Sequence, residues 1–149
     1  MLNKFFLIFI IIILNACSPS YEKLIKGDFN PKNELSKHLY ESYKQRADFE
    51  FNEMYDFNSA GLYSQKAIKA AKGEKILPEE ISYWKIKPNK KNELILSYNN
   101  IIAIYDDVAL SNPYNLAIAI TSLDCWSEQQ EENWQDWDIK RCRDSYLKA

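Results

Sequence analysis

Apolar residues recur at every third or fourth position along residues 33–54. The positions are Leu35, Leu39, Tyr43, Ala47, Phe51 and Met54. This spacing places the side chains on one face of a long amphipathic helix. The chain has only 3 Gly and 5 Pro in 149 residues, too few for the many tight turns of a β-sandwich or barrel. The sequence therefore predicts an all-α domain.

About five helices are expected, packed as hairpins. The first begins after Asn33, a residue type that caps helix N-termini. Asp56 breaks this helix and caps the second one, which ends near Gly73. The apolar connection over residues 74–90 is expected to pack across the core, with a short helical turn opening at Pro78.

Three more helices are expected in the remainder of the chain. Residues 92–110 allow two interpretations, because their apolar spacing fits a helix while Asn99-Asn100 suits the turn of a β-hairpin. The helix is preferred, since an isolated hairpin is only marginally stable in water. A fourth helix is expected over about 113–130, and the last from about residue 135.

The second expected helix contains the run Tyr55-Asp56-Phe57-Asn58-Ser59-Ala60 through Gln65-Lys66-Ala67. This run resembles the second helix of a tetratricopeptide repeat. In that motif, small residues such as Ala60 and Ala67 let the preceding helix approach closely. A second copy is missing at the repeat period of about 34 residues, and a solenoid needs at least three copies. One tetratricopeptide-like helical hairpin is therefore expected rather than an array.

Residues 1–16 have the features of an export signal. Lys4 precedes the apolar run from Phe5 to Leu14, which is far shorter than the roughly 20 residues of a membrane-spanning helix. The segment then reads Leu14-Asn15-Ala16-Cys17, which resembles the lipobox of bacterial lipoproteins. The resemblance implies cleavage before Cys17 and attachment of diacylglycerol to its thiol. A plain secretory signal with an incidental cysteine is the alternative.

Lipidation would hold the chain on a membrane, since two or three acyl chains exceed the single chain that binds only marginally. Ser18 follows the cysteine, whereas the familiar inner-membrane retention signal has Asp there. The resemblance therefore implies a lipid anchor in the outer membrane, with the protein facing the periplasm. In this scheme residues 17–32 are a lipidated tether and residues 33–149 form the helical domain.

Two cysteines, Cys125 and Cys142, remain for a disulfide. An even number of cysteines in an exported chain predicts pairing because the periplasm is oxidising. The pair would staple the last two helices and close an 18-residue loop, which stabilises by roughly 3 kcal/mol in the chain-entropy model. A metal site is the rival interpretation, but two thiols and the distant His38 fall short of the four ligands of structural zinc.

A long polar and aromatic run contains the first of these two cysteines: Leu123-Asp124-Cys125-Trp126-Ser127-Glu128-Gln129-Gln130-Glu131-Glu132-Asn133-Trp134-Gln135, and Arg141-Cys142-Arg143 follows with the second. With these segments, roughly residues 35–147 resemble the helical N-terminal region of certain OmpA-family envelope lipoproteins. In that family an OmpA-like domain that binds peptidoglycan follows this region. The 149 residues contain no segment that resembles this domain, so we do not expect the family's peptidoglycan binding here.

The segment 124–138 combines acidic residues with three tryptophans and contains no basic residue. One interpretation is a glycan-binding or peptidoglycan-binding surface, because aromatic faces stack on sugar rings and carboxylates bind hydroxyl groups. The candidate residues are Trp126, Glu131, Glu132, Trp134 and Trp137. The preferred interpretation is structural: Trp126 and Trp134 cover the disulfide, and the Glu/Gln run is a solvated face.

No catalytic residue, cofactor or metal is expected. The sequence lacks a Gly-rich phosphate loop and the H-E-x-x-H and G-x-S-x-G motifs. Its net charge of -2 and the absence of a long Lys/Arg run argue against nucleic-acid binding. We therefore expect a non-enzymatic envelope lipoprotein that binds the membrane through its anchor and docks an envelope protein. Glycan binding by segment 124–138 is the alternative function.

Overall fold

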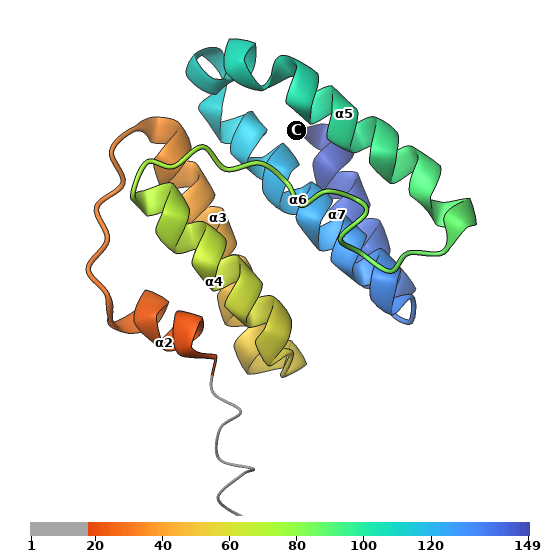
Figure 1. Cartoon of the computed structure of the whole chain (residues 1–149), viewed down its shortest axis with the longest axis horizontal. Coiled ribbons are helices and arrows are strands. Elements are labelled where there is room, and N and C mark those ends of the chain that lie inside the picture. The colour runs from red at the N-terminus through yellow and green to blue at the C-terminus, as the bar shows by residue number, and fades with distance from the viewer. Residues whose placement is uncertain (1–17) are drawn as a thin grey trace, which may run out of the picture.

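The computed structural model describes residues 18–149, which form an all-helical domain (Figure 1). The elements in chain order are α2 (Pro19–Lys26), α3 (Glu34–Phe49), the π-helix η1 (Glu50–Met54), α4 (Phe57–Ala71), α5 (Pro88–Ser111), α6 (Pro113–Glu132) and α7 (Asp136–Lys148). The expected all-α class is confirmed. The signal over 1–16 and the lipid site Cys17 lie outside the described residues, so both stay predictions.

Side-chain caps begin the first two long helices. The Asn33 side chain accepts a hydrogen bond from the backbone N–H of Ser36 at 2.8 Å and caps α3. The Asp56 side chain accepts hydrogen bonds from the N–H groups of Asn58 and Ser59 at 2.9 and 3.0 Å and caps α4. Gly73, with a φ of 82°, follows the end of α4. These boundaries confirm the sequence prediction.

Helices α3 and α4 form the expected hairpin. They pack closely along their lengths, and Ala60 and Ala67 on α4 are fully buried, as a close helix approach requires. Tyr43 of α3 and Tyr63 of α4 are also fully buried, with ring centroids 6.0 Å apart. At its C-terminal end α3 continues into η1, whose first residue, Glu50, is buried.

The segment expected to be a tether contains a packed helix. Residues Pro19–Lys26 form α2, which contacts α4 and buries Tyr21 and Leu24. The Tyr21 hydroxyl donates a hydrogen bond to Asp48 at 2.8 Å, and its ring stacks on Phe51 with centroids 4.0 Å apart. Within the described part of the expected tether, residues 19–26 are therefore a packed helix, held by its buried Tyr21 and Leu24.

The connection between α4 and α5 crosses the helices in an extended path (Figure 1). It buries apolar side chains, as expected: Ile76, Ile81, Trp84 and Ile86. The helical turn expected to open at Pro78 does not form. The N–H of Glu79 binds the carboxylate of Asp124 instead, at 2.6 Å, and a single turn follows at residues 81–84.

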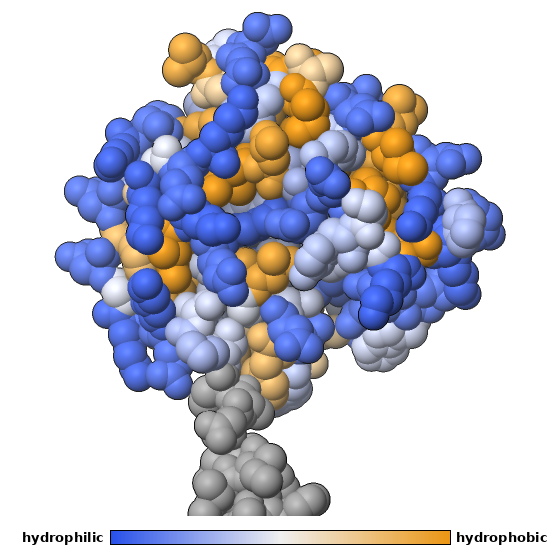
Figure 2. Space-filling model, in the orientation of Figure 1, coloured by the Kyte–Doolittle hydropathy of each residue, from blue (hydrophilic) through white to orange (hydrophobic). Residues whose placement is uncertain are grey.

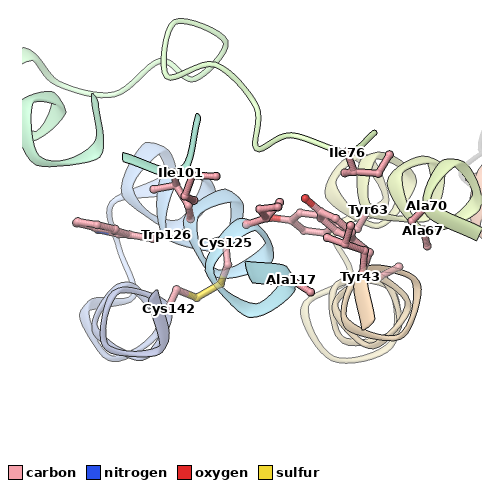
Figure 3. Packing of buried hydrophobic residues seen from close by; sticks show 14 of the residues in the cluster. Tyr43, Tyr63, Ala67, Ala70, Ile76, Ile101, Ala117, Cys125, Trp126 and Cys142 are labelled. Carbon is pink, nitrogen blue, oxygen red and sulfur yellow. A yellow bond between two sulfur atoms is a disulfide. The ribbon is translucent and has the colours of Figure 1, made fainter. Parts of the chain in front are cut away.

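Helix α6 is the centre of the domain and contacts α3, α5 and α7. Residues 92–110 lie within α5, so the hairpin alternative for them is wrong. In Figure 3 Ala117 of α6 points toward Tyr43 and Tyr63 of the α3–α4 hairpin. Cys125 and Trp126 of the same helix lie on its other side, where the disulfide joins α7. One continuous core therefore joins both halves of the domain. Within residues 18–149, none of the helices combines the length and the apolar character needed to cross a bilayer.

Candidate functional site

Most of the acidic segment 124–138 is buried, including the first part of its Glu/Gln run. Asp124, Glu128, Gln129 and Asp138 are each at most 2% exposed. The expectation of a solvated Glu/Gln face is therefore wrong as far as residue 130. The physical reason is the central place of α6, which α3, α5 and α7 cover on separate sides.

Asp124 is held by three donors from distant parts of the chain. The Tyr43 hydroxyl donates at 2.7 Å, the Lys66 ammonium at 2.6 Å and the N–H of Glu79 at 2.6 Å. Lys66 also lies 2.9 Å from the Glu79 carboxylate and donates to the carbonyl oxygen of Leu77 at 2.9 Å. The burial of these charges is tolerated because each has an opposite charge and further hydrogen bonds. Since its members come from α3, α4, α6 and the crossing segment, the cluster joins these four elements.

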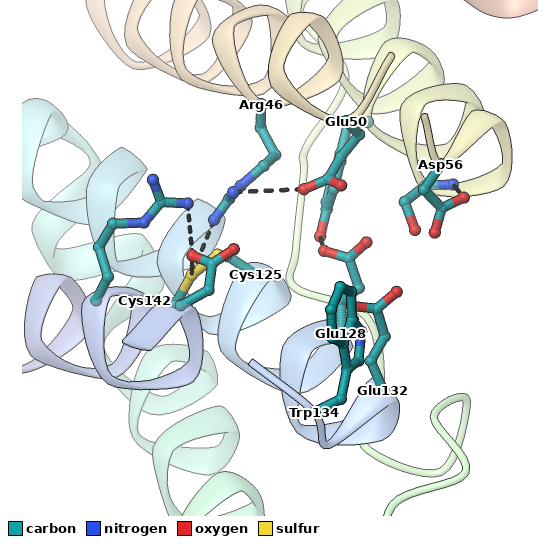
Figure 4. Close-up of polar contacts among 12 residues, drawn as sticks. Arg46, Glu50, Asp56, Cys125, Glu128, Glu132, Trp134 and Cys142 are labelled. Atoms are coloured by element: carbon teal, nitrogen blue, oxygen red, sulfur yellow. Dashed lines mark hydrogen bonds and ion pairs between the residues drawn. A yellow bond between two sulfur atoms is a disulfide. The ribbon is translucent and has the colours of Figure 1, made fainter. Parts of the chain in front are cut away.

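Two buried glutamates lie near each other between the hairpin and α6 (Figure 4). Burial, followed by the charge of Glu128, raises the pKa of Glu50 to about 8 against the opposing charge of Arg46. Burial raises the pKa of Glu128 to about 7, although hydrogen bonds from Ser59 and Tyr63 oppose the rise. The Tyr63 hydroxyl donates to Glu128 at 2.7 Å. With exposed fractions of 1% and 2%, neither glutamate is accessible to a ligand in this structure.

Cys125 on α6 and Cys142 on α7 form a disulfide, with Cα atoms 5.7 Å apart. The expected staple between the last two helices is thus confirmed. The Arg46 guanidinium donates to the Cys142 sulfur at 2.8 Å, and Arg141 forms an ion pair with buried Asp138 at 2.5 Å (Figure 4). Cys125, Asp138 and Cys142 lie close enough to hold a metal ion. Because the two sulfurs are bonded to each other, they are not the thiolates that metal binding needs.

A shallow hollow of about 340 Å³ lies beside the disulfide, between α3, α6 and α7. Two arginines line it, Arg46 and Arg141. Each already has an acidic partner, Glu50 at 3.4 Å and Asp138 at 2.5 Å. The arginines therefore act mainly as counter-charges to buried carboxylates.

The five candidate surface residues do not form one surface. Trp126 is buried in the core that contains the disulfide, and Glu131 is half-buried, where it accepts a hydrogen bond from the N–H of Lys85 at 2.7 Å. Glu132 is exposed, as are Trp134 and Trp137, at 68% and 58%. Trp126 thus packs as expected, whereas the expectation that Trp134 covers the disulfide is wrong.

The sequence pattern does not predict that Glu50, Lys66 or Asp124 belong to buried polar clusters, and the Glu/Gln run that contains Glu128 is wrongly expected to be solvated. A signal was present for the last two, because they follow buried Ile120 by four and eight residues and so share its helix face. Glu50 likewise follows buried Ala47 by three residues. A polar residue on a buried face predicts a polar partner elsewhere in the chain.

Comparison of the chain with protein-family models, curated proteins and solved structures finds no match.

Proposed function

We propose that this protein is a lipid-anchored lipoprotein of the bacterial cell envelope, held in the outer membrane and facing the periplasm. Its helical domain acts as a docking module for an envelope protein rather than as an enzyme. The anchor rests on the lipobox-like segment that ends at Cys17. The Cys125–Cys142 disulfide supports an exported chain, because disulfides persist in oxidising compartments.

The docking role rests on the outer side of α5. The exposed large aliphatic residues among the described ones number seven, and five of them lie on this helix: Ile95, Leu96, Ile102, Ile104 and Leu110. Figure 2 shows apolar patches among hydrophilic side chains over the upper right of this face, where α5 lies in Figure 1. Scattered apolar residues are normal on a protein surface, but their concentration on one helix indicates an interaction site.

The opposite side of α5 is occupied. Leu94, Ile101 and Tyr105 are buried, and the helix packs on α6. Ile95 and Ile102 are seven residues apart and therefore share one side of the helix, next to this buried stripe. An amphipathic helix of a partner would bury such a row, as in helix-in-groove recognition.

The anchor is tested by Cys17→Ala in cells that make the full chain. We expect the variant to move from the membrane fraction to the soluble fraction and to lose incorporation of labelled fatty acid. A variant in which Cys125 and Cys142 are both Ala is the control, since it removes the other two cysteines and should stay with the membrane. Unchanged membrane fractionation of Cys17→Ala would contradict the anchor.

Docking is tested with a photocrosslinking residue in intact envelopes. At position 102 on the apolar side of α5 it should give a discrete protein adduct, and at exposed position 37 on α3 it should not. Adding Leu96→Asp should weaken the adduct at position 102 without changing membrane fractionation. Equal adducts at both positions would contradict docking through α5.

Glycan binding by segment 124–138 is the second candidate, and the exposure of Trp134 and Trp137 favours it. Trp126 cannot contribute in this fold because it is buried. Co-sedimentation with isolated peptidoglycan that is lost in Trp134→Ala would support this function. Failure of the unmodified protein to pellet with peptidoglycan would exclude this mode of binding.

A further inference from the structure

Ser18, the first residue that the structure describes, is already packed against the domain. Ser18, the residue after the predicted lipid site, is only 8% exposed. It lies against α4 at Gly61, where an added Cβ atom would be 2.8 Å from the Ser18 hydroxyl oxygen. The Ser18 carbonyl accepts hydrogen bonds from the N–H groups of Tyr21 and Glu22 in α2. Ser18 is thus fixed on the domain both through α2 and through its contact with α4.

Ser18 is one of the residues that line an open hollow of about 1190 Å³ at this end of the domain. Its lining residues come from the start of α2, the junction of η1 and α4, and the crossing segment. We define the entry surface as the apolar and aromatic residues that line this hollow: Pro19, Met54, Tyr55, Phe57, Leu62 and Tyr83. Tyr55 and Tyr83 project most, with exposed fractions of 72% and 59%.

Covalent geometry brings the predicted anchor next to this surface. Cys17 precedes Ser18 directly, and consecutive Cα atoms across a trans peptide are about 3.8 Å apart. A diacylglycerol group on Cys17 would therefore hold the entry surface against the lipid head groups. Tyrosine suits that position, because its ring is apolar and its hydroxyl can bind water or head groups.

We infer that the entry surface rests on a zwitterionic lipid bilayer, with Tyr55 and Tyr83 at the level of the head groups. This inference deepens the proposed function and rests on lipidation of Cys17. Charged residues of both signs occur on the elements that border the hollow, with exposed Lys23 on α2 and exposed Glu53 on η1. Mixed charge of this kind favours head groups without net charge over strongly anionic ones.

Another exposed tyrosine offers a matched control at a distant point. Tyr114, 56% exposed, lies in the first turn of α6, and its ring contacts that of His38 near the start of α3 at 5.2 Å. Tyr55 lies beyond the other end of α3, and a helix of that length spans about 24 Å. Tyr55 and Tyr114 therefore sit at opposite ends of the α3 helix.

The test uses protein purified from the membranes of cells that make the full chain and then mixed with phosphatidylcholine vesicles. The vesicles have brominated acyl chains, which quench the fluorescence of tryptophans close to them. In a background with Trp134→Phe and Trp137→Phe, one protein receives Tyr55→Trp and the other Tyr114→Trp. We expect marked quenching for Tyr55→Trp and none beyond background for Tyr114→Trp. Tyr83→Trp in the same background gives a second, independent position and should behave like Tyr55→Trp. Flotation with the vesicles and circular dichroism are measured on every sample.

The outcomes separate the two proposals. If the proteins float with the vesicles but Tyr55→Trp and Tyr83→Trp are quenched no more than Tyr114→Trp, the anchor stands and the inferred orientation is wrong. If the folded proteins fail to float, the anchor itself is wrong and the orientation falls with it. Quenching that is equally strong at positions 55 and 114 would also overturn the orientation.

Discussion

Replacing Asp124 by Ala should lower the free energy of unfolding by about 3–5 kcal/mol, the usual cost of removing one partner of a buried ion pair. Asp124 is 1% exposed and lies 2.6 Å from the Lys66 ammonium. The substitution also leaves the buried Tyr43 hydroxyl without its acceptor, which costs about 1–3 kcal/mol where no water replaces it. The Glu79 carboxylate, 2.9 Å from Lys66, opposes the loss by remaining as a counter-charge.

Asp106→Ala is the matched control. Asp106 lies 2.5 Å from the Lys75 ammonium, but these side chains are 83% and 52% exposed. An exposed pair of this kind contributes about 0–1 kcal/mol. The two variants thus remove the same chemical group at nearly the same distance, and burial is the main difference between them.

Urea unfolding followed by circular dichroism measures both variants at neutral pH, with the disulfide intact. We expect a clearly lower midpoint for Asp124→Ala and a nearly unchanged one for Asp106→Ala. The double variant Asp124→Leu with Lys66→Met should recover part of the loss, because it removes both buried charges together. Equal midpoints for the two single variants, or no recovery in the double variant, would refute the reasoning.

Two further predictions concern the disulfide and the buried glutamates. Replacing Cys125 and Cys142 by Ala opens an 18-residue loop and should cost about 3 kcal/mol in urea unfolding, while the unmodified domain should show no alkylatable thiol by mass measurement under non-reducing conditions. Burial raises the pKa of Glu50 to about 8 and that of Glu128 to about 7, from a usual value of 4.5. At pH values between the usual pKa and the raised ones, the native state therefore binds more protons than the unfolded chain. These two groups should therefore make stability fall as the pH rises from about 5 to about 8, and Glu50→Gln should flatten that fall in urea midpoints; the same slope in the variant would contradict the assignment.

The long helices were predictable because their signals are local. The apolar stripe of α3, the caps at Asn33 and Asp56 and the stop at Gly73 each depend on residues only a few positions apart. Helix α2 was missed because two inward residues in an eight-residue segment do not establish a period.

The buried polar clusters could not be predicted in the same way. Asp124 binds Tyr43 across 81 positions, and Glu128 binds Tyr63 across 65. Hydropathy patterns count both acids as polar and assign them to solvent, whereas the fold supplies each with a phenol from the opposite hairpin. The partner, rather than the residue type, decides whether such a carboxylate can be buried.

The segment that crosses from α4 to α5 has a consequence for how the chain can vary. Its backbone is attached at three points, where Leu77 binds Lys66, Glu79 binds Asp124 and Lys85 binds Glu131. Connections between helices usually tolerate insertions and deletions, because little depends on their length. One residue gained or lost between positions 77 and 85 would shift at least one attachment out of reach of its partner. We expect homologous chains to keep the length of this stretch constant even where its amino acids differ.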